Sequence, residues 1–171
     1  MGQKLHIDFE TKCELNLKTV GLDLYIRHKS FRPIWVAYAL GDEGPTEVDL
    51  SDDDTLPDDL LDMLDDPDIE IWAFNAAFER LVLNRYYKLK IKIRRFRCSM
   101  ALAYMHAYVG NLDEIGGQMD IAAEFRKDKE GDRLMKMFSI PSKPTKNQPH
   151  VWRNKRTDPV DWRKYGAYCG Q

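Results

Sequence analysis

The sequence predicts a single α/β domain in which helices flank a mixed sheet of about five strands. Short apolar segments of strand length alternate along the chain with segments of helical periodicity. One pair of strands is joined by a tight turn and should be antiparallel, whereas later strands are separated by helices, which favours parallel pairing. A chain of 171 residues is long enough to bury one core.

The first half of the chain contains three predicted strands. Residues 4–9 form the first, and the nearly continuous apolar run at 34–40 forms a buried second. The sequence GDEG at 41–44 is a hairpin signal, so residues 46–50 should form a third strand antiparallel to the second. Residues 13–32 are polar and predict an irregular segment.

The middle of the chain predicts alternating helices and strands. Leucines at helical spacing indicate a short acidic helix, namely Leu56, Leu60, Leu61 and Leu64. Residues 69–74 predict a fourth strand and 96–99 a fifth. Between them Asn75 is a suitable N-cap for a helix that begins directly after the fourth strand.

The last third of the chain is predicted to be mostly helical. Helices are expected over 99–108, 112–124 and 128–138. Residues 139–157 are rich in proline and basic residues, which predicts a basic loop. Asp158 as N-cap and the proline that follows it should start a final helix that continues to the end of the chain.

Composition excludes several classes of protein. With 43% hydrophobic and 32% charged residues and a net charge of −2, the chain has no general basic field for nucleic acid. No apolar run approaches the ~20 residues of a membrane span, so no membrane contact is expected. Three widely spaced cysteines suggest neither a disulfide framework nor a zinc site, which favours a reducing cytoplasm.

Two basic segments are candidates for contact with phosphate. The segment KLKIKIRRFR at 88–97 holds six basic residues, and the loop at 139–157 holds several more. The first segment alternates with apolar residues and is better explained as a solvated face, although it could also follow a phosphate backbone. The loop is the better candidate for DNA, because it precedes the last helix.

Two carboxylates in the first strand need an explanation. Side chains alternate between the two faces of a strand, so Asp8 and Glu10 share one face while Leu5, Ile7 and Phe9 share the other. An aspartate and a glutamate at this spacing could simply face solvent on an edge strand. They could also be two ligands of one metal site, and the motif alone does not decide between these interpretations.

A third acid could join them. Glu79 lies one turn inside the helix that follows the fourth strand. If the fourth strand runs beside the first, Glu79 can point toward Asp8 and Glu10. An ordinary surface glutamate near the favourable end of a helix dipole is the alternative.

Three motifs in order resemble those of a known superfamily. DFET at 8–11, NAAFE at 75–79 and YCGQ at 168–171 resemble the exonuclease motifs of the DEDD 3′–5′ exonucleases. The resemblance is greatest to the proofreading domains of phage-type family-A DNA polymerases, and it extends over essentially the whole chain. It implies a ribonuclease H-like fold. The tyrosine in the third motif indicates the tyrosine subclass, DEDDy.

The resemblance also implies a role for each motif residue. Asp8, Glu10 and Glu79 would bind catalytic metal, two Mg²⁺ or Mn²⁺ ions being expected, and Tyr168 would help to position the attacking water. Glu79 replaces the commoner aspartate, which lengthens that side chain by one methylene. The fourth acid of the pattern would be residue 172, so we expect a single domain over 1–171 that is cut just before it.

The substrate would reach these acids as a single strand. Such strands are held by stacking and by backbone contacts. Phe9, Thr11, Asn75 and Phe78 are adjacent to the acids and are the candidate nucleic-acid contacts, with Thr11 offering its backbone N–H. Strict alternation favours a core position for Phe9, whereas for Phe78 the core and the surface are about equally favoured.

Three functions are compatible with the sequence. The first is a two-metal 3′–5′ exonuclease that hydrolyses phosphodiester bonds at the 3′ end of single-stranded or frayed DNA. It would proofread for a polymerase domain on its C-terminal side. The second is a non-catalytic domain that binds single strands or packs against the polymerase, and the third is an RNase of the same superfamily. We expect a monomer located in the cytoplasm, which is the host cytoplasm if a phage encodes it.

Overall fold

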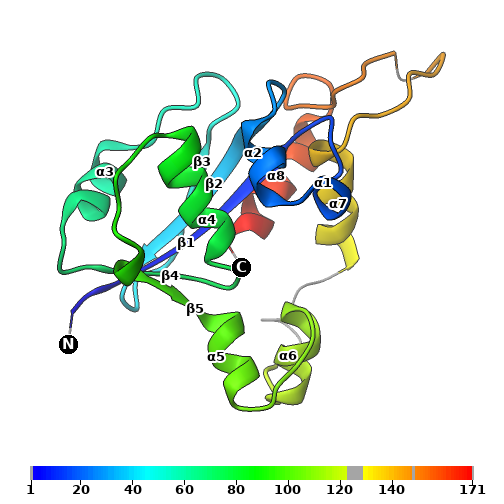
Figure 1. The fold of residues 1–171 in the computed structure, drawn as a ribbon. Coiled ribbons are helices and arrows are strands. Elements are labelled where there is room, and N and C mark those ends of the chain that lie inside the picture. The colour runs from blue at the N-terminus through cyan, green and yellow to red at the C-terminus, as the bar shows by residue number, and fades with distance from the viewer. Residues whose placement is uncertain (1, 123–128, 148, 171) are drawn as a thin grey trace.

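A five-stranded mixed sheet forms the centre of the protein (Figure 1). The computed structural model describes residues 2–122, 129–147 and 149–170. The strand order is β3-β2-β1-β4-β5, with antiparallel pairing from β3 to β1 and parallel pairing from β1 to β5. This confirms the predicted mixed α/β architecture. The strands are β1 (Lys4–Lys12), β2 (Arg32–Leu40), β3 (Thr46–Asp49), β4 (Glu70–Ala73) and β5 (Phe96–Cys98).

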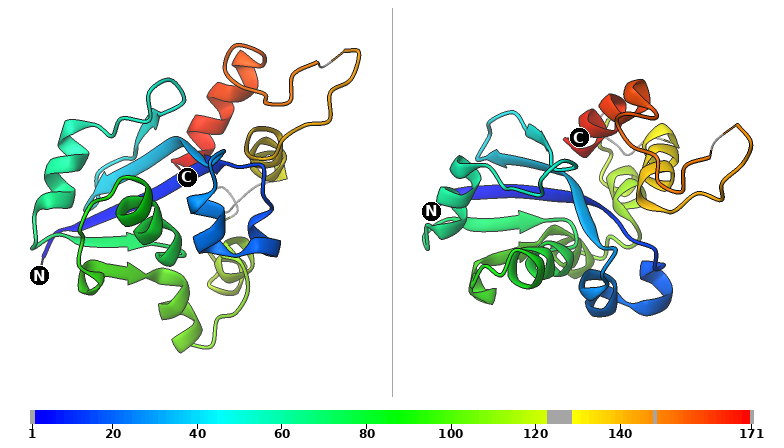
Figure 2. Two further views of the ribbon diagram at one scale, coloured as in Figure 1. Left: turned by 45° about the horizontal axis from the view of Figure 1, so that its top comes forward. Right: turned by 90° about the horizontal axis from the view of Figure 1, so that it is seen from above.

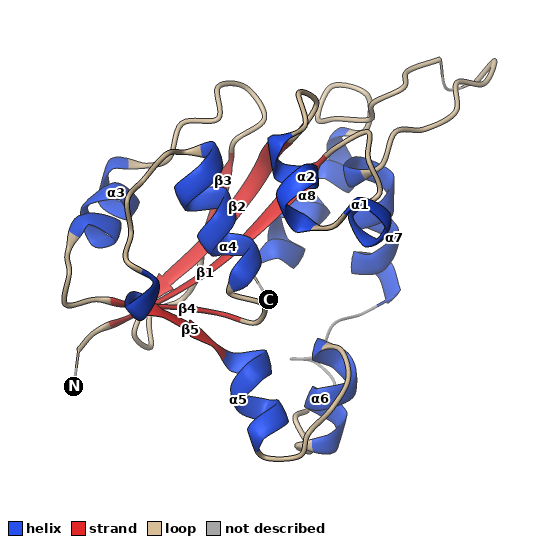
Figure 3. Cartoon of the chain, viewed as in Figure 1, coloured by secondary structure: helices blue, strands red, loops and turns tan. Residues whose placement is uncertain are grey.

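Helices cover both faces of this sheet (Figure 3). In chain order they are α1 (Leu17–Val20), α2 (Leu22–Arg27), α3 (Asp58–Asp65), α4 (Ala77–Leu81), the π-helical η1 (Val82–Tyr86), the 3₁₀ turn η2 (Ile93–Arg95), α5 (Ser99–Met105), α6 (Leu112–Gln118), α7 (Lys129–Ser139) and α8 (Pro159–Cys169). Figure 2 shows α4 and α8 on opposite sides of the sheet. The α5–α6 segment extends away from the end of β5. Within the described residues, no helix has the length and apolar character needed to span a membrane.

Two hydrophobic cores lie on the two faces of the sheet. The first joins Leu5, Ile7 and Phe9 of β1 to α2, α3 and η1. The second joins β2 to α7 and α8 and includes Phe138 and Trp162. The predicted alternation of β1 is therefore confirmed, since its three apolar side chains all point into the first core and its acids do not.

Residues 13–32 differ from the prediction of an irregular segment. They form α1 and α2, separated by Gly21 at a φ of +76°, which glycine adopts without strain. The Asn16 side chain accepts a hydrogen bond from the Lys18 backbone N–H and caps α1, while Tyr25 and Ile26 of α2 enter the first core. Each helix is too short to show a clear apolar period, which is why the sequence did not reveal them.

One predicted helix N-cap is wrong, and another is only partly correct. Asn75 lies exposed in the turn before α4, whose N-cap is Ala76, so the predicted cap at Asn75 is wrong. Asp158 does occupy the N-cap position of α8, but its carboxylate binds Arg153 and makes no cap hydrogen bond. The other predicted helices start close to their expected positions. The expected helix over 112–124 ends at Gln118, and residues 123, 124 and 128 lie outside the described residues.

Helix α8 is seated directly on the sheet. Gly166 faces the ring of Trp35 on β2, and a Cβ at this glycine would come within 2.6 Å of the ring. The Trp162 indole N–H donates to the Asp49 carboxylate at 2.9 Å, at the end of β3. Lys155, just before α8, donates to the same carboxylate at 3.3 Å. The position of α8 therefore depends on a close glycine contact and on one half-buried carboxylate.

We predict that Gly166→Ala destabilises the protein, although alanine normally favours a helix by ~1 kcal/mol. The new Cβ would overlap Trp35 and push α8 off the sheet, at an expected cost of about 1–3 kcal/mol. Urea unfolding should show a lower midpoint at an unchanged slope. Lys164→Ala, on the exposed side of the same helix, is the control and should change the midpoint little. A more stable Gly166→Ala variant would contradict the close seating.

Candidate functional site

Helix α8 lies over the acids of β1. Asp8 is exposed and Glu10 is half-buried. The Tyr165 hydroxyl donates to Glu10 Oε2 at 2.6 Å, and the Cys169 thiol lies 3.9 Å from the Asp8 backbone oxygen. Burial and the neighbouring Glu10 charge raise the pKa of Tyr165 well above its ordinary value, so this tyrosine keeps its proton. Helix α8 thus partly covers the acid face of β1 at Glu10, whereas the Asp8 side chain stays exposed.

Glu79 reaches the same region from the other side of β1. β4 pairs with β1 only over Lys4–His6, and α4 begins soon after β4 ends, so the first turn of α4 lies close to β1. Glu79 is only 4% exposed, and its Oε2 atom has no hydrogen-bond partner among the described residues. Burial, followed by the Asp8 charge and, more weakly, the Glu10 charge, raises the pKa of Glu79 well above its ordinary value.

The charges of Asp8 and Glu10 act on Glu79 and contribute to the raised pKa of its carboxyl. However, the part of the chain that the structure describes contains no group of three His, Cys, Asp or Glu side chains arranged to hold a metal ion. The donor chemistry does fit a hard divalent cation, because such ions prefer carboxylate oxygens and Glu79 offers a buried oxygen that lacks a partner.

A tyrosine outside the three motifs contacts an acid of β1. Tyr165, three residues before Tyr168, is the tyrosine whose hydroxyl reaches Glu10. Tyr168 is half-buried and stacks on Tyr165, with ring centroids 6.4 Å apart and an interplanar angle of 16°. Gly131 of α7 packs against the Tyr168 ring so closely that a Cβ would overlap it. Tyr165 was not among the predicted site residues, although its spacing places it on the same helix face as Tyr168.

The four candidate contacts to nucleic acid divide into two pairs. Phe9 is 4% exposed and lies against Tyr87 with ring centroids 6.1 Å apart, so its side chain belongs to the core. Thr11 is buried, with its hydroxyl 3.3 Å from that of Tyr25. These two side chains therefore offer no stacking surface. The core position favoured for Phe9 is confirmed, and its candidacy as a side-chain contact to nucleic acid is wrong. Asn75 is exposed and Phe78 is half-buried at the margin of the first core.

Basic side chains in both candidate segments are held by the protein itself. In the loop, Lys155 binds Asp52 at 2.5 Å and Arg153 binds Asp158. In the 88–97 segment, Arg95 is buried and donates to three backbone carbonyls between 63 and 69, so this part of the run is not a solvated face as predicted. Arg97 binds Glu70 at 2.7 Å. These four residues therefore contribute little free positive charge for a nucleic-acid backbone.

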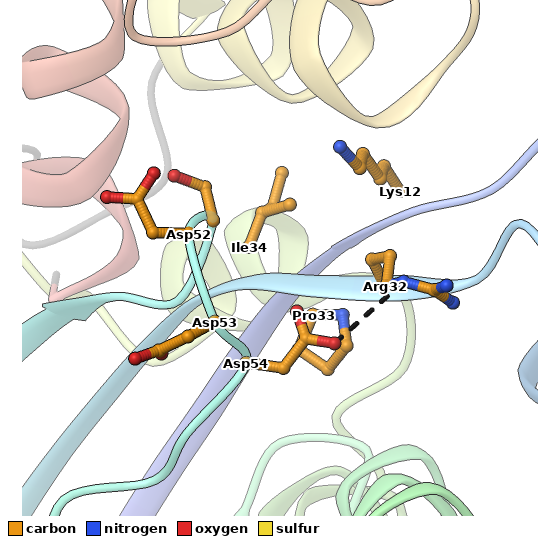
Figure 4. A pocket seen from close by; sticks show the side chains of 8 residues that line it. Lys12, Arg32, Pro33, Ile34, Asp52, Asp53 and Asp54 are labelled. Atoms are coloured by element: carbon orange, nitrogen blue, oxygen red, sulfur yellow. Dashed lines mark ion pairs between the residues drawn. The ribbon is translucent and has the colours of Figure 1, made fainter.

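A separate pocket of about 260 Å³ lies at the end of β1 (Figure 4). Its charged lining residues are Lys12, Arg32 and the acids of 52–54, with Arg32 and Asp54 3.8 Å apart. None of Asp8, Glu10 and Glu79 lines it. Its mixed charge and its lining identify it as a feature distinct from the acid site.

We predict that Glu79→Gln stabilises the metal-free protein at alkaline pH. Because the pKa of Glu79 is raised in the folded state, the unfolded state loses this proton first as the pH rises above about 4.5. The folded wild type therefore loses stability as the pH rises toward the folded pKa, whereas the amide variant does not. Unfolding in EDTA at pH 8 should show a gain of more than about 1 kcal/mol, and a smaller gain at pH 4.

The matched control is Glu43→Gln, an exposed glutamate in the turn after β2. Its effect on stability should be small and nearly independent of pH. If Glu79→Gln left the free energy of unfolding unchanged at both pH values, burial and the neighbouring acids would not destabilise the ionised Glu79 carboxylate.

Comparisons with known proteins agree with this fold. No family model matches the chain. The "DNA polymerase" of Bacillus phage SP02 is 34% identical over 168 residues, which cover 98% of this chain and 26% of that polymerase. The chain therefore spans about a quarter of the length of this curated relative.

Two solved structures share the fold. The apo form of a nuclease matches with a TM-score of 0.56 and 17% identity over 98% of this chain and 66% of its own. The Trypanosoma brucei RNase D complex with RNA U12 matches with a TM-score of 0.58 and 14% identity over 99% and 52%. The chain is thus homologous to a segment of a phage DNA polymerase and has the ribonuclease H-like fold of nucleases, as its three motifs predicted.

Proposed function

We propose that this chain is a metal-dependent 3′–5′ exonuclease domain that removes nucleotides from the 3′ end of single-stranded or frayed DNA. In the longer protein it would proofread for the polymerase that follows it. The observation that carries the proposal is the buried carboxylate of Glu79, which has an oxygen without a partner and lies close to Asp8 and Glu10. The relationship to a phage DNA polymerase supports DNA as the substrate.

Carboxylates gathered in this way are unfavourable by themselves. Burial and like charges both raise the free energy of the ionised form of Glu79. A divalent cation reverses the balance, since it neutralises the acids and is bound by their oxygens. Asp8, Glu10 and Glu79 would hold Mg²⁺ or Mn²⁺. Two such ions activate a water and stabilise the leaving oxygen of a phosphodiester.

The surrounding side chains would orient the reactants. Tyr168, on the α8 face that covers β1, would position the attacking water. Asn75 and Phe78 lie at the start of α4 beside Glu79, where an unpaired 3′ terminus could enter. A partly exposed aromatic ring suits a single strand because base stacking tolerates any sequence. Phe9 and Thr11 are buried as side chains, so only their backbone atoms would be left for the strand.

Two other functions have an observation in their favour. The described acids do not form a finished metal-ligand group, which favours a domain that binds single strands without cleaving them. The fold likeness to an RNase D solved with RNA favours an RNase of the same fold. A binding domain would leave the strand intact, whereas the proposed nuclease would cleave it. An RNase would degrade RNA in preference to DNA.

The test is degradation of a 5′-labelled single-stranded DNA oligonucleotide with Mn²⁺. We predict stepwise shortening from the 3′ end, measured on this chain and on a form that continues through position 172. Asp8→Asn or Glu10→Gln should reduce the rate at least ~100-fold, because loss of a metal ligand costs more than the 10–100-fold typical of an outer-shell partner. Glu14→Gln, an exposed residue just after β1, is the control and should retain wild-type activity.

Each of the other outcomes has a clear meaning. If both forms bind the strand but leave it intact, the domain is a binding module. If an RNA of the same sequence is degraded much faster than the DNA, the domain is an RNase. If the DNA is degraded equally fast with and without Asp8 and Glu10, the acids of β1 are not the metal ligands and the proposed site is wrong.

A further inference from the structure

We propose that Tyr165 is a positioning residue that holds the Glu10 carboxylate in the orientation needed for metal binding. This role rests on the proposed function, because it concerns the same acid site. None of the three motifs includes Tyr165. Its hydroxyl nevertheless makes a hydrogen bond of 2.6 Å with Glu10 Oε2, across 155 residues of sequence.

The first support is the rigidity of Tyr165. The side chain is 0% exposed. Its ring is stacked on Phe138 with centroids 5.4 Å apart and meets Trp162 edge-on at 6.4 Å. A ring packed in this way by α7 and α8 cannot change rotamer without opening the second core, so its hydroxyl is a fixed point. Glu10 is half-buried, and its carboxylate receives a hydrogen bond from this fixed hydroxyl.

The second support is a directed chain of hydrogen bonds. Ser139 Oγ lies 3.0 Å from the Tyr165 hydroxyl oxygen. A carboxylate can only accept, so Tyr165 gives its single proton to Glu10 and must accept from Ser139. Ser139 is itself fixed, because its backbone oxygen accepts a hydrogen bond from the Cys13 N–H just after β1, at 3.3 Å. The chain Ser139 to Tyr165 to Glu10 therefore joins the end of α7 and the middle of α8 to β1.

The hydrogen bond from Tyr165 would affect how Glu10 binds a cation. The bond to Oε2 fixes the rotation of the carboxylate, so that its oxygens are held in one orientation toward a cation. Partners that orient a ligand in this way typically contribute a factor of 10–100 in metal affinity. The carboxylate is then ordered before the cation arrives, so less conformational entropy is lost on binding.

The test is Mn²⁺ binding without substrate, followed by calorimetry or by the electron-spin resonance of free Mn²⁺, on the wild type and on Tyr165→Phe. The ring and its packing are kept and only the hydroxyl is lost. We expect Mn²⁺ to bind about 10-fold more weakly to the variant. Nuclease activity should fall at low Mn²⁺ and recover when Mn²⁺ is raised, which a purely structural defect would not do.

Two further variants sharpen the result. Tyr38→Phe is the matched control, because Tyr38 is also buried and donates to a carboxylate, that of Asp59 at 2.8 Å, on the opposite face of the sheet. It should leave Mn²⁺ affinity unchanged while losing a comparable hydrogen bond. Ser139→Ala, which removes only the upstream donor, should weaken Mn²⁺ binding less than Tyr165→Phe.

The two proposals fail in different ways. If the wild type binds Mn²⁺ and degrades DNA but Tyr165→Phe has the same Mn²⁺ affinity, the positioning role is overturned and the exonuclease proposal stands. If Tyr38→Phe weakens Mn²⁺ binding as much as Tyr165→Phe, the effect is general and the positioning role is again overturned. If the wild type binds no Mn²⁺ in either form of the chain, both proposals are overturned.

Discussion

Strand β1 lies at the centre of the sheet with helices on both sides. It must therefore bury apolar side chains on one face while it carries two carboxylates on the other. Its apolar side chains enter the first core, and strict alternation then places Asp8 and Glu10 under α8 on the other face. A carboxylate covered by a helix needs a partner for its charge or its lone pairs. The hydrogen bond from Tyr165 supplies one for Glu10, and it makes the position of α8 part of the acid site.

The position of α8 is fixed largely by Asp49. Burial of Asp49 acts to raise its pKa, but hydrogen bonds from Ser51 and Trp162 and the charge of Lys155 outweigh that effect and hold the pKa below its ordinary value. One ionised carboxylate at the end of β3 thus anchors both the loop before α8 and the helix itself. Two basic side chains of that loop are consequently engaged with acids, so the loop acts more as a structural clamp than as a phosphate-binding surface.

The sequence was informative where the pattern is local. The period of two in β1 predicted which of its residues are buried, and the breaks at turns predicted all five strands and their mixed pairing. The contact between α8 and β1 was not readable. Tyr165 meets Glu10 across 155 residues, and no local period encodes that encounter. The short helices α1 and α2 depend on tertiary packing that overrides local propensity. The same is true of the start of α4, where Ala76 is the N-cap although Asn75 was predicted.

The acids of the site come from two separate elements, β1 and α4, and Glu79 shows what this arrangement costs. A carboxylate on α4 has no local reason to be 4% exposed, since burial and the acids of β1 both oppose its ionisation. Folding must place it there through the packing of α4 and η1 in the first core, where Val82 and Leu83 are fully buried. The free energy of that core offsets an unfavourable charge arrangement, which a proton on Glu79 or a bound cation would relieve. The packing of the first core therefore stabilises the fold enough to keep the Glu79 carboxylate in a position that is unfavourable without a cation.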